Sequence, residues 1–564
     1  MILPLRDVRG RLGLVHGAAL TALFLQVIAG PGLAETTADQ EASKIAAGQQ
    51  IYRLGILQSG EGITGVSSGD IPVSGVQVAC ENCHRRSGLG SSEGGKVVPP
   101  LTGQALFQSR ERDQQSPFRS RSMKSRDRPA YDSASLAKAI RSGIDSGGNE
   151  LDPLMPRYAM SDSDVEALAA YMETLASELP PGIDDSYVHL ATIAARNADE
   201  SDRQTMLEIL QAFTDDKNAN TRNESGRADR GPYYRAYRDD SYRKWILHVW
   251  QPEGDSETWP AQLEALYEAQ PIFALVSGVG EGSWRPVHDF CESNEIPCIF
   301  PITDQPALDE DFYSIYLSGG LFRESQAVVS YLAEALPAGS GPVVQVYRAG
   351  STGEAMARAF SRASAGSSLA VHGIPLASSG PPSAAFWHDL QAGQEPGAVL
   401  AWLSPEDLVN FAPGSAADPD RSEIVVLSHS LVGSEVFALG GSMGDRVRIV
   451  SLLELPERRD LGLRRLRTWL KPREIELTRE RIQGDAFLAA TLAGSAVKHM
   501  RRNFSREYMI EIIEHGLDNS VFRSVYPQLT LGPNQRFASK RAYILRPAGE
   551  SSADWVPVES TPKP

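Results

Sequence analysis

The stretch Cys80-Glu81-Asn82-Cys83-His84 decides the fold of the first part of this 564-residue chain. Two thiols three positions apart can each form a thioether with a vinyl group on one side of a porphyrin, and the adjacent imidazole can bind the iron. A Cys-x-x-Cys pair alone also occurs in redox disulfides and as half of a zinc site. The histidine that follows directly, in a sequence with only four cysteines, favours haem. We therefore predict one covalently bound haem c, attached by Cys80 and Cys83, with His84 as an iron ligand.

A methionine ahead of a predicted helix supplies the candidate for the second axial ligand. Met155 lies in Leu154-Met155-Pro156-Arg157-Tyr158, and Ser161 and Asp164 then form a capping-box pattern that marks a helix start. A soft thioether donor suits electron transfer at a high potential. Met155 is the predicted ligand, Met160 is the second candidate, and a purely structural methionine is the third possibility.

From about residue 46 to 179 the chain resembles class I monohaem cytochromes c. Met-Pro-x-Tyr resembles the ligand loop of that family, and Pro99-Pro100-Leu101-Thr102-Gly103 resembles its Pro-x-Leu-x-Gly turn. The resemblance implies an all-α domain in which the carbonyl of Pro99 accepts the N–H of His84; an ordinary turn is the alternative. The departure from the family is a basic insert, residues 108–130. We interpret it as a solvated loop, with a docking patch for an acidic redox partner as the alternative.

The first 34 residues have the pattern of a signal peptide. Arg6, Arg9 and Arg11 precede a mostly apolar stretch, and Gly32-Leu33-Ala34 offers a cleavage site before Glu35. An uncleaved membrane anchor is the alternative. No other segment reaches the ~18 apolar residues of a spanning helix. We expect a periplasmic protein with no membrane span after cleavage, and the net charge of −16 argues against nucleic-acid binding.

Two cysteines remain once the haem motif is assigned. Cys291 and Cys298 lie seven residues apart, one near the end of a predicted helix and one at the start of a predicted strand. In an oxidising compartment such a pair favours a disulfide, which we predict here; two buried free thiols are the alternative.

After a linker at Pro180-Pro181-Gly182 the chain alternates between strand and helix patterns. The predicted strands are 187–194, 245–250, 272–277, 298–302, 343–347, 398–403 and 423–427, with helices at 262–269 and 284–292. This alternation indicates parallel sheets with crossover helices, and its length indicates two lobes. The predicted organisation is a signal peptide (1–34), an all-α cytochrome c domain (35–180), a two-lobed α/β domain (185–548) and a disordered tail (549–564).

The α/β region resembles the type I periplasmic binding proteins of the leucine/isoleucine/valine class. The resemblance is clearest over residues 273–306, which end in Ile-Pro-Cys-Ile-Phe-Pro-Ile-Thr-Asp, and over 529–536. It implies a small organic solute held between the lobes, with Ser283 and Thr303 at the matching positions. Free N–H groups at a helix start suit a carboxylate. The same residue types also serve as plain helix caps.

These features predict a periplasmic electron-transfer protein whose second domain binds a solute and gates or localises the redox step. The alternative is a solute receptor that uses haem as a redox input. We expect no enzyme activity, because methionine ligation would block the iron. A redox partner protein is implied, and the resemblance to chains that accompany quinoprotein alcohol dehydrogenases suggests a quinoprotein dehydrogenase as that partner.

Overall fold

The computed structural model describes most of the chain after residue 31. The described ranges are 32–93, 96–109, 128–228, 243–309, 311–376, 379–411, 423–441, 444–500, 503–518, 523–532, 535–548 and 555–558. The predicted signal peptide, apart from its last three residues, and most of the basic insert lie outside these ranges. Within them, no helix has both the length and the apolar character needed to cross a membrane.

The first domain is a small helical unit around the Cys-x-x-Cys-His turn. Its helices are α1 (Gly32–Leu54), α2 (Cys80–His84), α3 (Gly103–Leu106), α4 (Ser133–Ser142) and α5 (Asp162–Thr174). The first and last of these pack closely: a Cβ at Gly48 would lie 2.0 Å from the carbonyl oxygen of Ala167, so only glycine fits. The predicted capping box of α5 is confirmed, with Ser161 and Asp164 bonded reciprocally.

The first domain also contains two small sheets, which the all-α prediction missed. Strands β1 (Thr64–Ser67), β2 (Ile71–Ser74) and β5 (Arg157–Ala159) form an antiparallel sheet in the order β2-β1-β5. Strands β3 (Ser91–Glu93) and β4 (Lys96–Val98) form a second antiparallel pair. The β1–β2 hairpin turns at Gly69 and Asp70, which both have positive φ as a tight hairpin requires.

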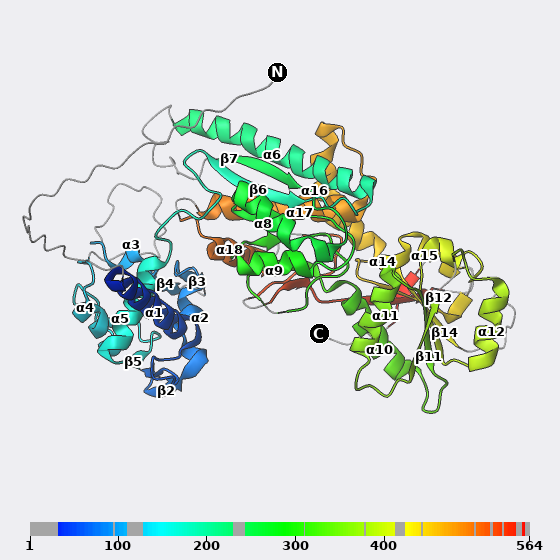
Figure 1. Ribbon diagram of the computed structural model, residues 1–564, viewed down its shortest axis with the longest axis horizontal. Coiled ribbons are helices and arrows are strands. Elements are labelled where there is room, and N and C mark those ends of the chain that lie inside the picture. The colour runs from blue at the N-terminus through cyan, green and yellow to red at the C-terminus, as the bar shows by residue number, and fades with distance from the viewer. Residues whose placement is uncertain are drawn as a thin grey trace, which may run out of the picture.

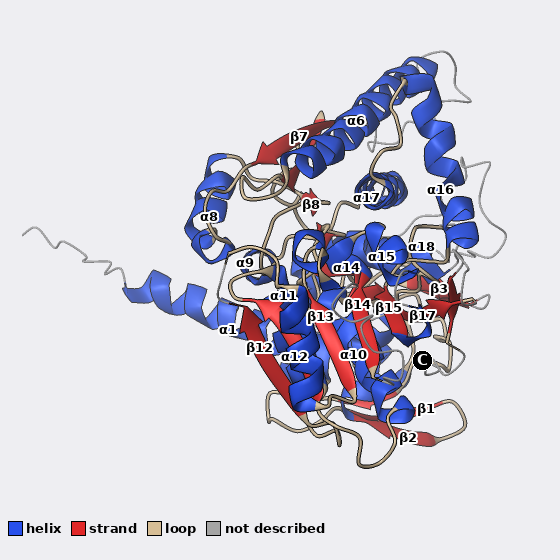
Figure 2. Ribbon diagram, turned by 90° about the vertical axis from the view of Figure 1, so that its right-hand side faces the viewer, coloured by secondary structure: helices blue, strands red, loops and turns tan. Residues whose placement is uncertain are grey.

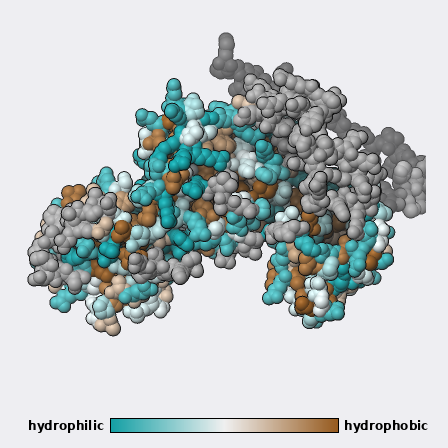
Figure 3. All heavy atoms as spheres, turned by 180° about the vertical axis from the view of Figure 1, so that it is seen from behind, coloured by the Kyte–Doolittle hydropathy of each residue, from teal (hydrophilic) through white to brown (hydrophobic). Residues whose placement is uncertain are grey.

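Lobe 1 of the second region is built on a six-stranded parallel sheet in the order β16-β10-β9-β8-β6-β7. Its strands are β6 (Tyr187–Ile193), β7 (Lys244–Trp250), β8 (Ala274–Val276), β9 (Cys298–Ile299), β10 (Ser314–Ser318) and β16 (Phe537–Ser539). The helices of this part are α6 (Glu200–Ala228), α8 (Pro260–Ala269), α9 (Arg285–Ser293), α16 (Pro456–Leu470), α17 (Glu480–Met500) and α18 (Arg506–Asp518). Figure 3 shows mainly hydrophilic side chains on the visible face of the molecule, with smaller apolar spots between them.

Lobe 2 carries a seven-stranded sheet in the order β12-β11-β13-β14-β15-β17-β18. Its strands are β11 (Val343–Arg348), β12 (Val371–Leu376), β13 (Ala398–Trp402), β14 (Ile424–Ser428), β15 (Val447–Ser451), β17 (Tyr543–Pro547) and β18 (Trp555–Pro557), and its helices include α10 (Gly320–Ala335), α11 (Thr352–Ala363), α12 (Ala384–Gln394), α14 (His429–Val432) and α15 (Glu435–Gly441). The chain passes between the lobes after β10, after β15 and after β16. Figure 1 shows the first domain, lobe 1 and lobe 2 side by side. The predicted two-lobed α/β architecture is confirmed.

The end of the chain corrects one prediction. Residues 549–564 were expected to be disordered, but Trp555–Pro557 form β18, which pairs antiparallel with β17. The backbone N–H of Val558 donates to Ile544, and the Trp555 ring contacts Phe437 edge to face at 5.9 Å. Partial burial of this tryptophan and the added backbone bonds hold the segment in place.

Candidate functional site

The haem-binding motif forms the single helical turn α2. His84 is 7% exposed, and its Nδ1 lies 2.8 Å from the carbonyl oxygen of Pro99. Because a carbonyl can only accept, Nδ1 carries the proton and Nε2 keeps a free lone pair. Burial lowers the pKa of His84 to about 4, against the opposing effect of the bond to Pro99. The imidazole is therefore neutral and oriented as an iron ligand must be, with Pro99 as the partner expected from the sequence.

A glycine brings Pro99 back to the histidine. Gly90 has φ 78°, and a Cβ there would lie 2.2 Å from the carbonyl oxygen of Val98. Its backbone N–H donates to the carbonyl of His84 at 3.0 Å. The chain can therefore return close to His84 after the β3–β4 hairpin, and this return fixes the position of the Pro99 carbonyl.

The two candidate methionines differ in what surrounds them. Met160 is 7% exposed and belongs to the apolar core of the first domain, with Ile51 and Leu168 among its members. Met155 is partly exposed and lies outside that core, on the turn before β5. Its backbone is held by a bond from its N–H to Asp152 and by a bond from Arg157 to its carbonyl. The core already uses Met160, whereas the side chain of Met155 remains available to a ligand.

Tyr158 connects the methionine loop to the haem turn. Its hydroxyl donates to the carbonyl of Val78 at 2.9 Å, two residues before Cys80. Its backbone lies in β5, opposite Gly65 of β1. Burial, with the nearby Cys80 and Cys83, raises the pKa of Tyr158 well above its usual value, so the hydroxyl stays a donor. The loop that would carry the methionine ligand and the turn that would carry the histidine ligand are thus held in fixed positions relative to each other.

Helix α18 of the second region covers the residues just after the haem turn. The backbone N–H of Ser87 donates to Oε1 of Glu511 at 2.8 Å, and its hydroxyl donates to Oε2 at 2.6 Å. Both residues are buried. Burial raises the pKa of Glu511 to about 8, partly offset by these two bonds. A buried bidentate contact therefore joins the two-lobed region to a residue three positions from His84.

Charge and aromatic contacts extend this junction. The guanidinium of Arg86 lies 4.2 Å from the ring centroid of Phe312 and 5.4 Å from that of Tyr313. The hydroxyl of Tyr313 bonds to Glu507 of α18 at 2.7 Å. Glutamates at 507, 511 and 514 share one face of the helix, and the cytochrome side contributes Arg86 and also Arg85, which is close enough to Glu514 to act on it electrostatically. We call this set of residues the α18 junction.

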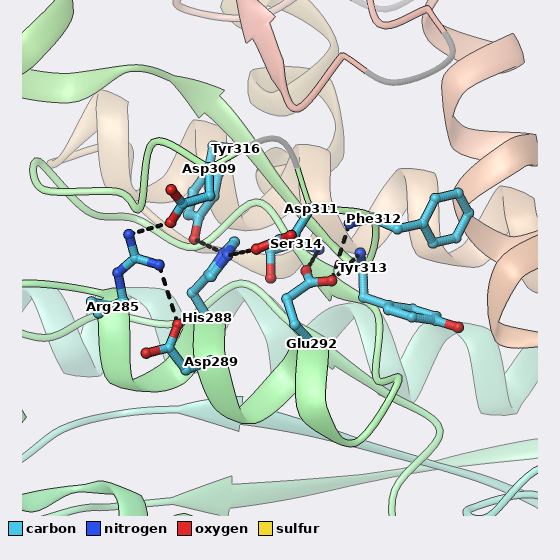
Figure 4. A network of polar contacts seen from close by, with 10 residues as sticks. All are labelled: Arg285, His288, Asp289, Glu292, Asp309, Asp311, Phe312, Tyr313, Ser314 and Tyr316. Atoms are coloured by element: carbon cyan, nitrogen blue, oxygen red, sulfur yellow. Dashed lines mark hydrogen bonds and ion pairs between the residues drawn. The ribbon is translucent and has the colours of Figure 1, made fainter. Parts of the chain in front are cut away.

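The loop that carries Phe312 and Tyr313 is braced by Glu292 at the end of α9 (Figure 4). One carboxylate oxygen accepts the N–H groups of Phe312 and Tyr313, both at 3.0 Å, and the other accepts that of Ser314 at 2.7 Å. Three charge-assisted bonds to consecutive N–H groups fix the loop backbone. The backbone positions of Phe312 and Tyr313 in the α18 junction are therefore fixed by α9, a helix of lobe 1.

A histidine and two carboxylates beside this loop are close enough to hold a metal ion, but an arginine is already there. The candidate ligand atoms of His288, Asp309 and Asp311 lie within 4.8 Å of one another. Nε2 of His288 lies 3.0 Å from Asp311, and Nδ1 lies 3.1 Å from the hydroxyl of Tyr316. Arg285 pairs with Asp309 and also contacts Asp289 (Figure 4). The guanidinium balances this acidic charge, so we assign no metal here.

The two predicted solute-binding loops lie next to each other, but the hydroxyls of Ser283 and Thr303 each bond to a backbone N–H nearby in the sequence. The N–H of Trp284 donates to the carbonyl of Gln305 at 3.0 Å, which joins the loops. The hydroxyl of Ser283 accepts from the N–H of Arg285, and that of Thr303 accepts from the N–H of Gln305. Both are contacts of a local Ser/Thr turn, in which the hydroxyl accepts from the N–H two residues further along the chain. Solute binding by Ser283 and Thr303 stays a prediction.

Cys291 and Cys298 are neighbours in the core of lobe 1. Both are 0% exposed, one on α9 and one on β9, and the structure records them as free thiols rather than as the predicted disulfide. Burial, with Cys298 beside it, raises the pKa of Cys291 well above its usual value. The adjacency is that expected from the sequence; formation of the S–S bond stays a prediction.

Sequence reasoning missed a buried polar network where the chain passes between the lobes. Glu324 on α10 is 0% exposed and accepts hydroxyl bonds from Ser428 at 2.6 Å and Ser430 at 2.8 Å. Burial raises the pKa of Glu324 to about 7. Arg481 on α17 pairs with Asp304 at 2.5 Å. The only sequence signal was that Glu324 falls among residues on the buried face of α10.

Together these features define a class of protein: a small helical domain with a Cys-x-x-Cys-His turn, joined to a two-lobed α/β domain with three inter-lobe passages. Residues 76–176 match the family model for cytochrome c, so the chain contains a cytochrome c domain. The rest of the chain forms two α/β lobes, one on a six-stranded sheet and one on a seven-stranded sheet. No curated protein matches the chain.

Several solved structures are similar to the second region. A fatty acid ABC transporter substrate-binding protein from Thermomonospora curvata is 15% identical, with a TM-score of 0.47, covering 68% of this chain and 94% of its own. A branched-chain amino acid ABC transporter from Thermus thermophilus with bound valine is 14% identical, with a TM-score of 0.46, covering 67% and 96%. A possible leucine/isoleucine/valine-binding protein from Rhodopirellula baltica is 16% identical, with a TM-score of 0.44, covering 67% and 98%.

Proposed function

We propose that the protein is a periplasmic electron carrier with one covalently bound haem c, ligated by His84 and Met155. The contact that carries this proposal is the hydrogen bond from Nδ1 of His84 to the carbonyl of Pro99. It leaves Nε2 with a lone pair free for iron, on the same turn as both cysteines. When bound, haem supplies a one-electron couple. The chain's own residues hold the imidazole neutral, keep Met155 outside the core and tie the two ligand segments together through Tyr158.

We further propose that the two-lobed domain binds a small organic solute and thereby gates or localises the redox step. The α18 junction supports coupling, because a change in the position of α18 or of residues 311–314 would act on Arg86 and Ser87, next to the haem turn. A solute receptor that uses haem as redox input is the alternative. We expect no catalytic turnover, since Met155 would fill the open iron position.

The test is a redox titration of the haem-loaded full chain with and without alcohols, amino acids and aromatic acids. We expect a His/Met spectrum and a midpoint potential that shifts when one of these compounds binds. A solute that raises the unfolding temperature but leaves the potential unchanged would refute coupling while retaining solute binding. Rapid peroxide turnover would refute the carrier function itself.

The electron donor or acceptor is a separate part of the proposal. We propose a periplasmic redox protein, and a quinoprotein dehydrogenase as the first candidate. Stopped-flow reduction of the haem by such an enzyme would support this choice. Reduction no faster than by a small-molecule reductant of the same potential would argue against it.

A further inference from the structure

A large groove on lobe 1 lies apart from the haem turn and from the loops of Ser283 and Thr303. Its volume is about 1290 Å3, and it is lined by parts of α6, α16, α17 and the segment 523–525. Figure 2 shows α17 nearly end-on, with α6 and α16 on either side of it. This volume exceeds the roughly 300–1,000 Å3 of compact small-molecule pockets. The occupant should therefore be extended.

One face of α17 runs the length of the groove. Its lining residues recur every three or four positions from Gly484 to Lys498. At 1.5 Å per residue these 14 steps span about 21 Å. Three glycines, at positions 462, 484 and 494, are among the lining residues, and Gly462 allows α16 to approach the backbone of Ser524, where a Cβ would lie 2.2 Å from its carbonyl oxygen. The shape of the groove suits a long, narrow ligand.

The interior of the groove is apolar and aromatic. The Trp469 ring lies 5.0 Å from that of Phe487 and 6.2 Å from that of Phe213, measured between centroids. Leu463, Leu466, Leu488 and Val525 also line it. Such a surface gains free energy by covering an alkyl chain, about 0.8 kcal/mol for each buried methylene.

The rim of the groove is strongly basic, although the chain as a whole is acidic. Six basic side chains line it, and they are Lys217, Arg464, Arg465, Arg473, Lys498 and Arg523. Asp216 is the one acidic lining residue, and Arg473 already pairs with it. Arg464, Lys498 and Arg523 form no ion pair with any described residue. The rim is therefore complementary to an anion.

A polar atom inside the groove points to the same kind of ligand. Thr491 is 8% exposed and lines the groove, and its hydroxyl has no hydrogen-bond partner in the described part of the chain. A buried hydroxyl without a partner costs free energy unless a ligand oxygen or water satisfies it. An oxygen of a ligand head group or ester would do so.

We propose that this groove binds an anionic amphiphile, with the apolar chain along α17 and the anionic head on Arg464, Lys498 and Arg523. A free long-chain carboxylate and an anionic phospholipid share this chemistry. The site is independent of the proposed electron transfer, because neither its lining nor its chemistry includes the haem turn or the α18 junction.

Calorimetric titration of the haem-loaded full chain tests the proposal. Palmitate should bind at least about 10-fold more tightly than hexanoate and than hexadecyltrimethylammonium, because chain burial and negative charge both contribute. The double variant Arg464→Glu/Lys498→Glu should bind palmitate at least about 10-fold more weakly. The matched variant Arg358→Glu/Lys138→Glu changes exposed cations on α11 and α4 and should bind as wild type.

Vesicle co-sedimentation separates the two sources of the ligand. Preference for phosphatidylglycerol over phosphatidylcholine vesicles, lost in the rim variant, identifies a bilayer lipid; palmitate binding without vesicle binding identifies a free carboxylate. Both results support the site. Equal binding of the cationic amphiphile, no binding of palmitate or vesicles, or an unaffected rim variant with wild-type unfolding temperature would overturn it.

Discussion

The haem turn and the α18 junction that covers its neighbours are built in opposite ways. The haem turn takes five consecutive residues of α2 and one carbonyl fifteen positions away. The α18 junction combines residues near 86, 312 and 511, which no spacing rule connects. Covalent attachment to one porphyrin demands a fixed local spacing, whereas a contact surface only demands complementary charge and shape. The residues for haem attachment are therefore local in the sequence, whereas those of the contact surface beside them are distributed.

The largest effect should follow from removing the attachment chemistry. Cys80→Ala/Cys83→Ala leaves no thiol near the porphyrin, so covalent haem should fall to near zero. Haem content per protein after acid–acetone extraction measures this. Cys291→Ala, which removes a thiol in lobe 1, should retain full haem. Covalent haem in the double variant would show that attachment does not depend on these two cysteines.

The axial methionine comes next. Met155→Ala should remove the thioether ligand and lower the midpoint potential by on the order of 0.1–0.3 V, since axial ligands span about 0.8 V across haem proteins. Potentiometry and the red absorbance band of a methionine–iron bond report this change. Met160→Leu should keep both the midpoint potential and the red absorbance band, and should cost under about 1.5 kcal/mol of stability. The reverse pattern would identify Met160 as the ligand.

The variant Glu511→Ala tests the contribution of the α18 junction. It leaves the N–H and hydroxyl of Ser87 buried without partners, which should cost about 1–3 kcal/mol. We expect a lower unfolding temperature for the full chain and a separate, earlier transition for one domain. The control Asp518→Ala removes an exposed carboxylate at the end of the same helix and should be silent. Silence in both variants would show that the α18 junction contributes nothing.

The smallest effect is a pH dependence of the same contact. Burial raises the pKa of Glu511 to about 8, and that of Glu514 to about 7, in the presence of Glu507 and the facing arginines. A raised folded-state pKa gives stability that is complete at low pH and is lost as pH rises through the folded value. The contact should therefore weaken between about pH 5 and pH 9.

Glu511→Gln sharpens that prediction. The amide can accept from the Ser87 N–H and donate to its hydroxyl, so the geometry survives without a titrating group. Thermal unfolding of variant and wild type should coincide near pH 5 and diverge at pH 9, with the variant more stable. Parallel curves across this range would show that Glu511 does not titrate there.

The sequence predicted features whose cause is local. The Cys-x-x-Cys-His turn, the capping box of α5 and the alternating strands of both lobes follow from spacing or periodicity, whereas the Pro99 partner was implied by the resemblance to class I cytochromes c. Several strand boundaries agree to within one or two residues, as for β6, β7 and β14.

What escaped prediction depends on partners distant in the sequence. Strand β18 is too short to show a pattern and forms because β17 offers it an edge. Glu324 and Glu511 look like ordinary helical glutamates until Ser428 and Ser87 are placed beside them. The three-stranded sheet of the cytochrome domain likewise depends on β5 returning to β1 after ninety residues.

The late position of β16 has a consequence for biogenesis. This edge strand of lobe 1 comes from residues 537–539, after every parallel strand of lobe 2 has been made. A chain threaded across a membrane from its N-terminus would expose the haem turn long before lobe 1 could close and α18 could cover Ser87. We expect the attachment machinery to act on a nascent cytochrome domain that is still open on that side.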